Sequence, residues 1–386
     1  MHAYWGALGI IVLGLGLVDV FLTALNYDES GFIAVRLCGL QWRCLRGITR
    51  RLPRRWRPLA LRQVTGLNIM LALTFWLGSV IAGYGLIYYS QMVETNFQYN
   101  GRNLAAGLFA AMYFSAAQLA TVGTSQISPE TGALRALSVL ETLTGVGLVT
   151  LILTFLLGVY QVIRDLRALS SNFVTAEGGV DDPVVSLGPY FSYVELSCLD
   201  NHLRSISESF WSYVDGLRQH HMAYYFQSGR DQFSLPHALH MLGQWLAVLR
   251  WGLPTNHSLS AQPLLTQLSF QFEQFADYLQ DQIGWTNTAA PQAVPFDCFS
   301  TAYSTGDATS DRWLGRFLRL NRDMARLARL ELAVDPREAH LRYQQWLPFA
   351  YRAEQLTTAV SWDLDYQPTV HGGAADQTIV QIKHDL

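Results

Sequence analysis

Residues 113–129 read YFSAAQLATVGTSQISP, and the interpretation of the whole chain starts from this stretch. It is apolar at first, then becomes small, hydroxyl-rich and glycine-containing, and it lies between two long apolar segments. This pattern predicts a short helix that enters a membrane, turns, and leaves as extended backbone. Non-helical backbone at membrane depth is tolerated only where it is buried in protein or lines a water-filled path. The stretch is therefore predicted to line such a path.

The composition indicates a chain of two kinds of segment. Of its 386 residues, 50% are hydrophobic and 15% are charged. This is too apolar for an ordinary soluble protein and too polar for one made only of membrane spans. The apolar residues concentrate before about residue 163, and the polar ones follow. The four cysteines show no zinc or disulfide spacing, so we expect reduced thiols.

Three apolar runs are long enough to cross a bilayer, which takes about 20 residues. They cover residues 4–25, 67–89 and 134–162. The first lacks the basic start and the cleavage site of a signal peptide, so it is predicted to stay as a span. Asp19 lies inside it and is expected to face protein or water, with a packing or interfacial role as the ordinary explanation.

Nine arginines and no lysine, aspartate or glutamate occur between Arg36 and Arg62. Nucleic acid is one partner for such a run, but its position between two spans favours a cytoplasmic loop under the positive-inside rule. The N-terminus is then outside and the C-terminus inside. Anionic lipid headgroups are attracted to arginines at this depth. The candidates for this contact are Arg50, Arg51, Arg54 and Arg55.

The stretch 113–129 resembles the pore loop of the potassium-channel superfamily, whose usual text is near YFSxVTLTTVGYGDxxP. The residues on matching positions are Tyr113, Phe114, Ser115, Leu119, Thr121, Val122, Gly123 and Pro129. The resemblance implies an all-α membrane protein with an outer helix, a pore helix near 104–120, a selectivity filter at 121–125 and an inner helix. It also implies a homotetramer, because one loop per chain cannot surround an ion.

The filter text departs from the family at its outer end. Thr124 stands where the family has tyrosine, and Ser125-Gln126 replace Gly-Asp. In the resembling channels, residues 121–125 supply the carbonyl rings for K⁺, so the matching TVG implies that the inner sites are retained. The lost glycine tolerates positive φ, which implies a different outer filter. Three functions remain open: a cation channel with relaxed selectivity, a K⁺-selective channel, and a non-conducting sensor or scaffold.

The resemblance also assigns roles around the filter. Tyr113 and Phe114 are expected to support it, and Glu141 resembles a family glutamate that braces the filter from behind. The candidates for the cavity wall and the gate are Gly145, Gly147, Thr150 and Thr154. The two threonines share a helix face and either line the wet cavity or hydrogen-bond to the preceding turn. The two glycines either bend the helix or allow close packing.

Helical periodicity dominates the polar part of the chain and predicts an all-α cytosolic domain. Residues 176–189 are rich in Gly, Asp and Pro and predict a linker. The expected segments are a span at 1–35, a basic loop at 36–63, a pore module at 64–168, a linker at 169–189, the cytosolic domain at 190–364 and a flexible tail at 365–386. Residues 18–25 and 220–254 loosely resemble bacterial potassium-channel-family proteins, which implies a bacterial inner membrane but no defined ligand.

Other functional classes lack a motif. No G-x-G-x-x-G follows a predicted strand, and we find no nucleophile–base pair, phosphate loop or HExxH, so an enzyme is not expected. An Arg-rich face at 311–332 is expected to be solvated, with lipid or a neighbouring subunit as alternatives. Four histidines suggest a metal site but lack further ligands at the right spacing, so surface or packing roles are favoured. They are His220, His221, His237 and His240. No cofactor is expected beyond a permeant K⁺ or another monovalent cation.

Overall fold

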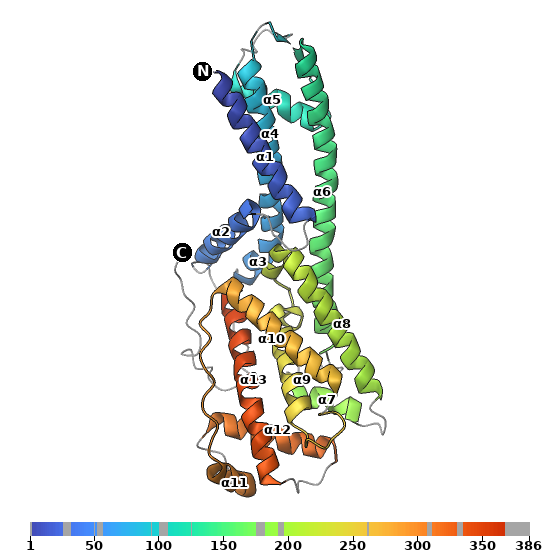
Figure 1. Ribbon diagram of the computed structural model, residues 1–386, viewed down its shortest axis with the longest axis vertical. Helices are drawn as coiled ribbons and strands as arrows, with labels where there is room; N and C mark the ends of the chain where they lie inside the picture. The colour runs from blue at the N-terminus through green and yellow to red at the C-terminus, as the bar shows by residue number, and fades with distance from the viewer. Residues whose placement is uncertain are drawn as a thin grey trace. The chain divides into compact units, whose positions relative to one another are not determined.

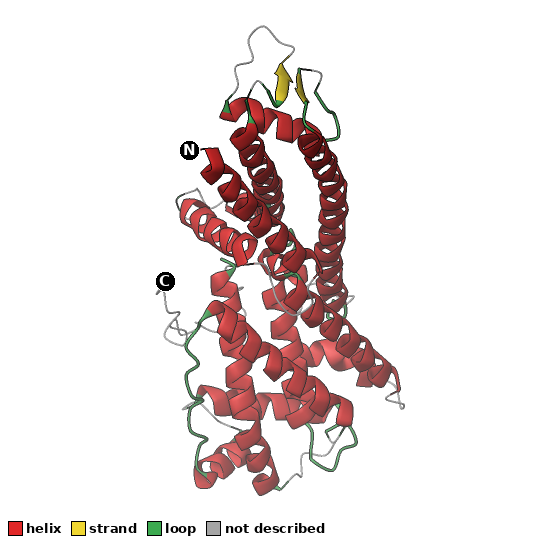
Figure 2. Cartoon of the chain, turned by 45° about the horizontal axis from the view of Figure 1, so that its top comes forward, coloured by secondary structure: helices red, strands yellow, loops and turns green. Residues whose placement is uncertain are grey.

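The computed structural model describes residues 2–25, 32–49, 51, 57–93, 95–99, 107–124, 126–174, 182–191, 197–260, 262–306, 311–329 and 335–366. In this part of the chain nearly all regular structure is helical, with one two-stranded sheet (Figures 1 and 2). The chain divides into two compact units. The first contains residues 1–163 and 215–227, and the second contains residues 164–214 and 228–386.

The first unit contains three helices that are long and apolar enough to cross a membrane. They are α1 (His2–Leu25), α4 (Val64–Gln91) and α6 (Gly132–Ser171), the last of which runs on into the second unit. The prediction of an all-α membrane protein is confirmed. Helix α6 extends beyond the inner helix that was expected at residues 134–162. Its 40 residues span about 60 Å, whereas a bilayer core is only about 30 Å thick.

Small residues allow α1 to pack directly on α4. A Cβ added to Gly9 would lie 2.6 Å from the carbonyl oxygen of Gly83, and one added to Gly83 would lie 2.7 Å from the Cβ of Leu13. Gly16 faces Ser79 at a similarly close approach. Close backbone contact of this kind is how helices gain packing energy in lipid, where the hydrophobic effect is weak. The first span is thus attached to the second one along its length.

The expected basic loop contains two helices, α2 (Phe32–Thr49) and α3 (Arg57–Arg62). On α2 the buried residues are Cys38, Trp42, Arg46 and Thr49, at helical spacing on one face. Trp42 packs against Leu61 and Val64, at the start of α4. The arginines of this segment favoured a loop in the sequence analysis, but the spacing of its buried residues is helical.

A small sheet closes the loop between α4 and α6. Strand β1 (Phe97–Tyr99) pairs antiparallel with β2 (Ile127–Pro129), and the short helix α5 (Leu108–Leu119) lies between them in sequence. The register places Phe97 opposite Pro129 and Tyr99 opposite Ile127. In Figure 1, α5 lies between α4 and α6, at the end of the unit away from α2. The helix falls within the predicted range, whereas the sheet is a feature that was not expected.

The second unit is built around α9 (Leu235–Trp251), which is buried along most of its length. The other elements that follow α6 in the chain are α7 (Pro183–Phe191), α8 (Ser197–Gln219), η1 (His221–Tyr225), η2 (Asp231–Phe233), α10 (Pro263–Ile283), α11 (Phe296–Thr305), α12 (Arg312–Leu327) and α13 (Pro336–Asp363). The residues of η1 and the end of α8 belong to the first unit.

Two helices of the second unit form where loops were expected. Helix α7 lies in the expected linker; Asp182 caps its N-terminus, and Ser186 accepts a 2.8 Å hydrogen bond from the indole of Trp245. The sequence of residues 286–309 predicts a loop, but helix α11 forms within it, and its Phe299 is fully buried against His340. Both helices are stabilised by partners far away in sequence, so local composition gave the wrong assignment.

The packing of α1 on α4 makes a prediction. Gly83→Val should lower the thermal unfolding midpoint in detergent by several degrees, because overpacking a tight contact costs about 1–3 kcal/mol. Gly78→Val on the same helix is the control, since a Cβ there meets nothing within 4 Å. Equal shifts in the two variants would contradict the packing described.

Candidate functional site

The chain leaves α5 through a sharp reversal. The amide groups of Val122 and Gly123 both donate to the carbonyl oxygen of Ala117, at 3.1 and 3.0 Å. Thr121 and Gly123 have φ values of 58° and 68°, in the left-handed region. This conformation is easy for glycine but is a strained outlier for a β-branched residue. Strain of this kind persists only where the surrounding structure imposes it, and it clusters at functional sites.

The first two residues of the predicted filter are exposed at the surface of the chain. Val122 is 81% exposed, and Thr121 is exposed as well. The hydroxyl of Thr124 lies within hydrogen-bonding distance of both the carbonyl oxygen of Ile127 (3.3 Å) and its amide nitrogen (3.2 Å). Thr124 therefore ties the outer filter to the first residue of β2. Ser125 lies outside the described residues.

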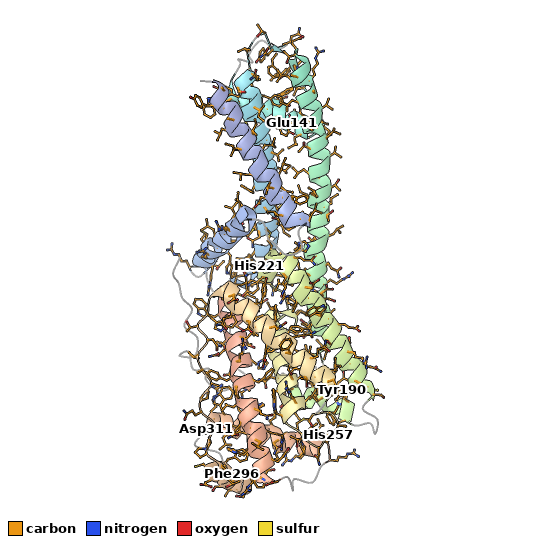
Figure 3. All side chains as sticks on the ribbon, in the orientation of Figure 1. Glu141, Tyr190, His221, His257, Phe296 and Asp311 are labelled. Atoms are coloured by element: carbon orange, nitrogen blue, oxygen red, sulfur yellow. The ribbon has the colours of Figure 1, made fainter. Side chains whose placement is uncertain are left out.

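Glu141 on α6 connects this helix to α4 and α5 (Figure 3). Its side chain is completely buried. One carboxylate oxygen accepts a 2.5 Å hydrogen bond from the hydroxyl of Ser115 on α5, and the other accepts a 2.8 Å bond from the hydroxyl of Tyr88 on α4. A buried carboxylate is tolerated when both oxygens are paired in this way. Glu141 thus holds α5 against α4, and α5 leads into the predicted filter.

An aromatic cluster supports the same region. The ring of Phe114 lies edge-on to Tyr88 at 4.9 Å and to Phe97 at 5.8 Å between ring centroids. Such T-shaped pairs add specific geometry to apolar burial. Tyr113 lies on the other side of α5, where its side chain is 44% exposed. Of the two residues expected to support the filter, Phe114 is therefore part of the aromatic cluster, whereas Tyr113 is exposed at the surface of the chain.

Three members of this arrangement were not singled out from the sequence: Tyr88, Phe97 and Ser115. Ser115 matches the family text, but the match alone does not say what its hydroxyl binds. In the sequence, Tyr88 belongs to an aromatic group with Tyr84 and Tyr89, and such a group at the end of a span is typical of a membrane interface. A buried acid such as Glu141 needs donors, and this requirement is the signal that points to nearby hydroxyl groups.

The inner-helix candidates separate into two kinds. A Cβ added to Gly145 would collide with the carbonyl oxygen of Leu119, so this glycine permits the close packing of α6 against the end of α5. Gly147 has open space around it in the subunit. Close packing rather than bending is thus the observed role of Gly145.

Thr150 and Thr154 hydrogen-bond to the preceding turn of their own helix. Their hydroxyl groups donate to the carbonyl oxygens of Val146 (3.1 Å) and Thr150 (3.0 Å). Both threonines are exposed in the subunit. Because the back-bonded hydroxyl keeps its lone pairs, this arrangement is compatible with a wetted cavity wall.

The remaining candidates lie away from the filter. Arg51 is exposed, whereas Arg50, Arg54 and Arg55 lie outside the described residues or have undescribed side chains. Within the parts of the chain that the structure describes, no group of three or more His, Cys, Asp or Glu side chains could hold a metal ion. The ring of His220 packs against Phe155.

Residues 70–161 match the family model described as an ion channel. This segment is an ion channel domain of the potassium-channel family. It covers most of α4, all of α5, the filter and most of the apolar part of α6. The resemblance found in residues 113–129 is confirmed, and the family points to a channel rather than an enzyme. No curated protein and no solved structure gives a significant match to the chain.

The bracing by Glu141 makes a prediction for the channel domain. Glu141→Ala leaves the buried hydroxyl group of Tyr88 without its carboxylate acceptor, at a cost of about 1–3 kcal/mol, while the hydroxyl group of Ser115 keeps the carbonyl oxygen of Ile81 (3.1 Å) as an acceptor. The thermal unfolding midpoint should fall clearly. Glu130→Ala is the matched control, because Glu130 forms only an exposed ion pair with Arg135. If both variants unfold at the same temperature, the carboxylate is not a brace.

Proposed function

We propose that the protein is a homotetrameric cation channel in which four copies of residues 121–125 surround a passive ion path. The observation that carries the proposal is the strained, outward-facing TVG segment within an ion channel domain. One subunit covers only one side of these carbonyl groups. A closed ring of four such loops is how backbone oxygens replace the hydration shell of K⁺.

The exposed face of α6 supports an assembly in the membrane. Its large apolar side chains are each more than half exposed and recur at helical spacing. They are Val139, Leu143, Val146, Val149, Leu153 and Leu157. An apolar strip of this length needs lipid or other subunits to cover it. In a tetramer, part of this face would line the cavity and the rest would contact neighbours.

The filter text bears on selectivity. Val122 and Gly123 keep the family identity, whereas Thr124 ties the outer filter locally to β2 instead of presenting a phenol. We therefore favour a channel with relaxed or altered K⁺ selectivity, with a K⁺-selective channel as the nearest alternative. A non-conducting sensor or scaffold, signalling through the second unit, is the alternative from another class.

Ion flux from liposomes tests the proposal. Vesicles that contain the purified protein should release K⁺ down its gradient, and Gly123→Asp should abolish the flux because Gly123 is left-handed and borders the path. Gly132→Asp is the folding control, since it introduces the same acid at the start of α6, where a Cβ meets nothing within 4 Å. Comparing K⁺, Na⁺ and Cs⁺ separates the two channel alternatives.

A tetrameric protein with no flux of any of these ions would contradict conduction and favour the scaffold. Equal flux of all three ions would assign a general cation pore. Flux of K⁺ alone would show that the inner filter sites suffice for selectivity.

We further propose a multi-pass topology in a bacterial inner membrane, with the N-terminus outside and the C-terminus in the cytoplasm. The nine arginines between the first two spans support it under the positive-inside rule. Helix α4 is about 42 Å long and exceeds the bilayer core, so its first turns lie at headgroup depth. Helix α2 packs on these turns, where the thiol of Cys38 contacts the carbonyl oxygen of Asn68.

The outer face of α2 is suited to anionic lipid. Leu40 and Ile48 are 54% and 59% exposed, and Cys44 between them is also exposed, all on one face. Arg36 and Arg43 are exposed beside this strip. An amphipathic helix with apolar and basic residues in this arrangement lies in the membrane interface.

The lipid partner can be tested with Arg36→Gln/Arg43→Gln. Each arginine near an anionic surface contributes about 1 kcal/mol, so affinity for anionic lipid should fall by more than tenfold. The measurement is lipid retention by the purified protein in native mass spectrometry. Arg326→Gln, on the exposed side of α12, is the control. Unchanged retention in the double variant would exclude α2 as the lipid site.

A further inference from the structure

Residues 215–227 belong to the first unit, although the residues before and after them belong to the second. They comprise the end of α8 and the turn η1, with the text DGLRQHHMAYYFQ. Within the first unit this segment, here called the coupling segment, packs against α2, α4 and α6. Helix α8 continues from it to Ser197, so the chain that reaches the membrane helices leads directly into the second unit.

The coupling segment contacts one face of α6. The ring of His220 lies edge-on to Phe155, with 5.8 Å between ring centroids, and it fills the space over Gly158. A Cβ on Gly158 would overlap the imidazole, because it would lie 2.7 Å from Cε1. One turn further on, a Cβ on Gly216 would lie 2.8 Å from Val162. Glycine on each side thus permits a close fit between the two helices.

The same segment contacts α2. The Cys38 thiol lies 3.8 Å from the sulfur of Met222, and the rings of Trp42 and Tyr225 lie 5.5 Å apart. Burial lowers the pKa of His220, and it lowers that of His221 to about 4. Both rings are therefore neutral near pH 7, and the contact with α6 is one of shape and aromatic packing.

Asp19 of the first span holds the other side of this arrangement. Its buried carboxylate accepts a 2.9 Å hydrogen bond from the indole of Trp76 on α4 and a 2.8 Å bond from the amide of Ile33 in the first turn of α2. An anion at a helix N-terminus is favourable. The Trp76 ring lies edge-on to Phe155, with centroids 5.2 Å apart. A continuous chain of contacts therefore runs from Asp19 through Trp76 and Phe155 to His220.

We propose that α1 is a regulatory helix, in which Asp19 fixes Trp76 against Phe155 and so sets how the inner helix α6 meets His220 of the coupling segment. The inference deepens the proposed function, since it assigns the gate control of the same channel. The physical reason is that a buried carboxylate bonded to donors on α2 and α4 holds these two helices in one geometry, because a shift of either donor weakens a buried hydrogen bond. A change in the second unit then reaches α6 through α8 and through the contact of the His220 ring with Gly158.

The first test is a double-variant cycle on the contact between Gly158 and His220. Gly158→Ala should change the K⁺ flux rate by at least about fivefold, the lower end of usual coupling free energies. In a His220→Ala background the added methyl meets no ring, so Gly158→Ala should have little further effect. Gly14→Ala on α1 is the matched control, because its Cβ meets nothing within 4 Å. Independent, additive effects of the two substitutions would overturn the proposal.

The second test addresses α1 and does not depend on ion flux. The reporter is a thiol from Gln161→Cys, at an exposed polar position on α6 near Gly158 and outside the apolar strip, in a background where Cys44, Cys198 and Cys298 are serine. Asp19→Asn and Trp76→Phe should both change its reaction rate with a water-soluble maleimide, and the double variant should change it no further than either single one.

These outcomes separate the regulatory role from a purely structural one. If α1 only anchors the chain, Asp19→Asn lowers the unfolding temperature while the thiol reactivity stays that of the parent, which overturns the proposal. If the parent protein shows no flux, the proposed function fails while the thiol cycle still decides the coupling.

Discussion

Every backbone polar group at membrane depth must find its partner inside the protein, and this constraint governs the site. The reversal after α5 meets it when the carbonyl oxygen of Ala117 accepts the amides of Val122 and Gly123. The return path is completed by pairing of β2 with β1. The buried charge of Glu141 is in turn satisfied by hydroxyl groups from α4 and α5. Each non-helical or polar element is thus matched within the same few turns.

The two units are stabilised in ways that reflect their surroundings. Among the membrane helices, specificity comes from close backbone approach, as between Gly9 and Gly83, and from a few buried polar pairs. The second unit instead buries large aromatic side chains and holds a buried arginine by hydrogen bonds. Arg342 is 1% exposed and donates to the carbonyl oxygen of Trp251 (2.8 Å) and to the side chain of Asn321 (3.0 Å). Apolar burial drives packing in water, whereas it contributes little to packing between helices in lipid.

The sequence predicted the spans and the pore helix because apolar runs and a specific text at 113–129 carry local information. It did not predict α7 or α11, since distant side chains decide whether these short segments are helical. The site divides in the same way. Glu141 could be named from its position, but its partners Ser115 and Tyr88 follow only from the folded arrangement of three helices. Asp19 was expected to face protein or water, and the identity of Trp76 as its donor likewise required the structure.

The length of α6 has a mechanical consequence. As a single helix of 40 residues it is about 60 Å long, with the contacts of the filter near one end and those of Phe155 beyond its middle. Such a rod acts as a lever, since a tilt of about 5° around its centre displaces each end by roughly 2–3 Å. That displacement is comparable to the clearance that separates a glycine from an alanine against a neighbouring ring. In the proposed channel, such a tilt would move the end of α6 near the filter and so alter the width of the ion path.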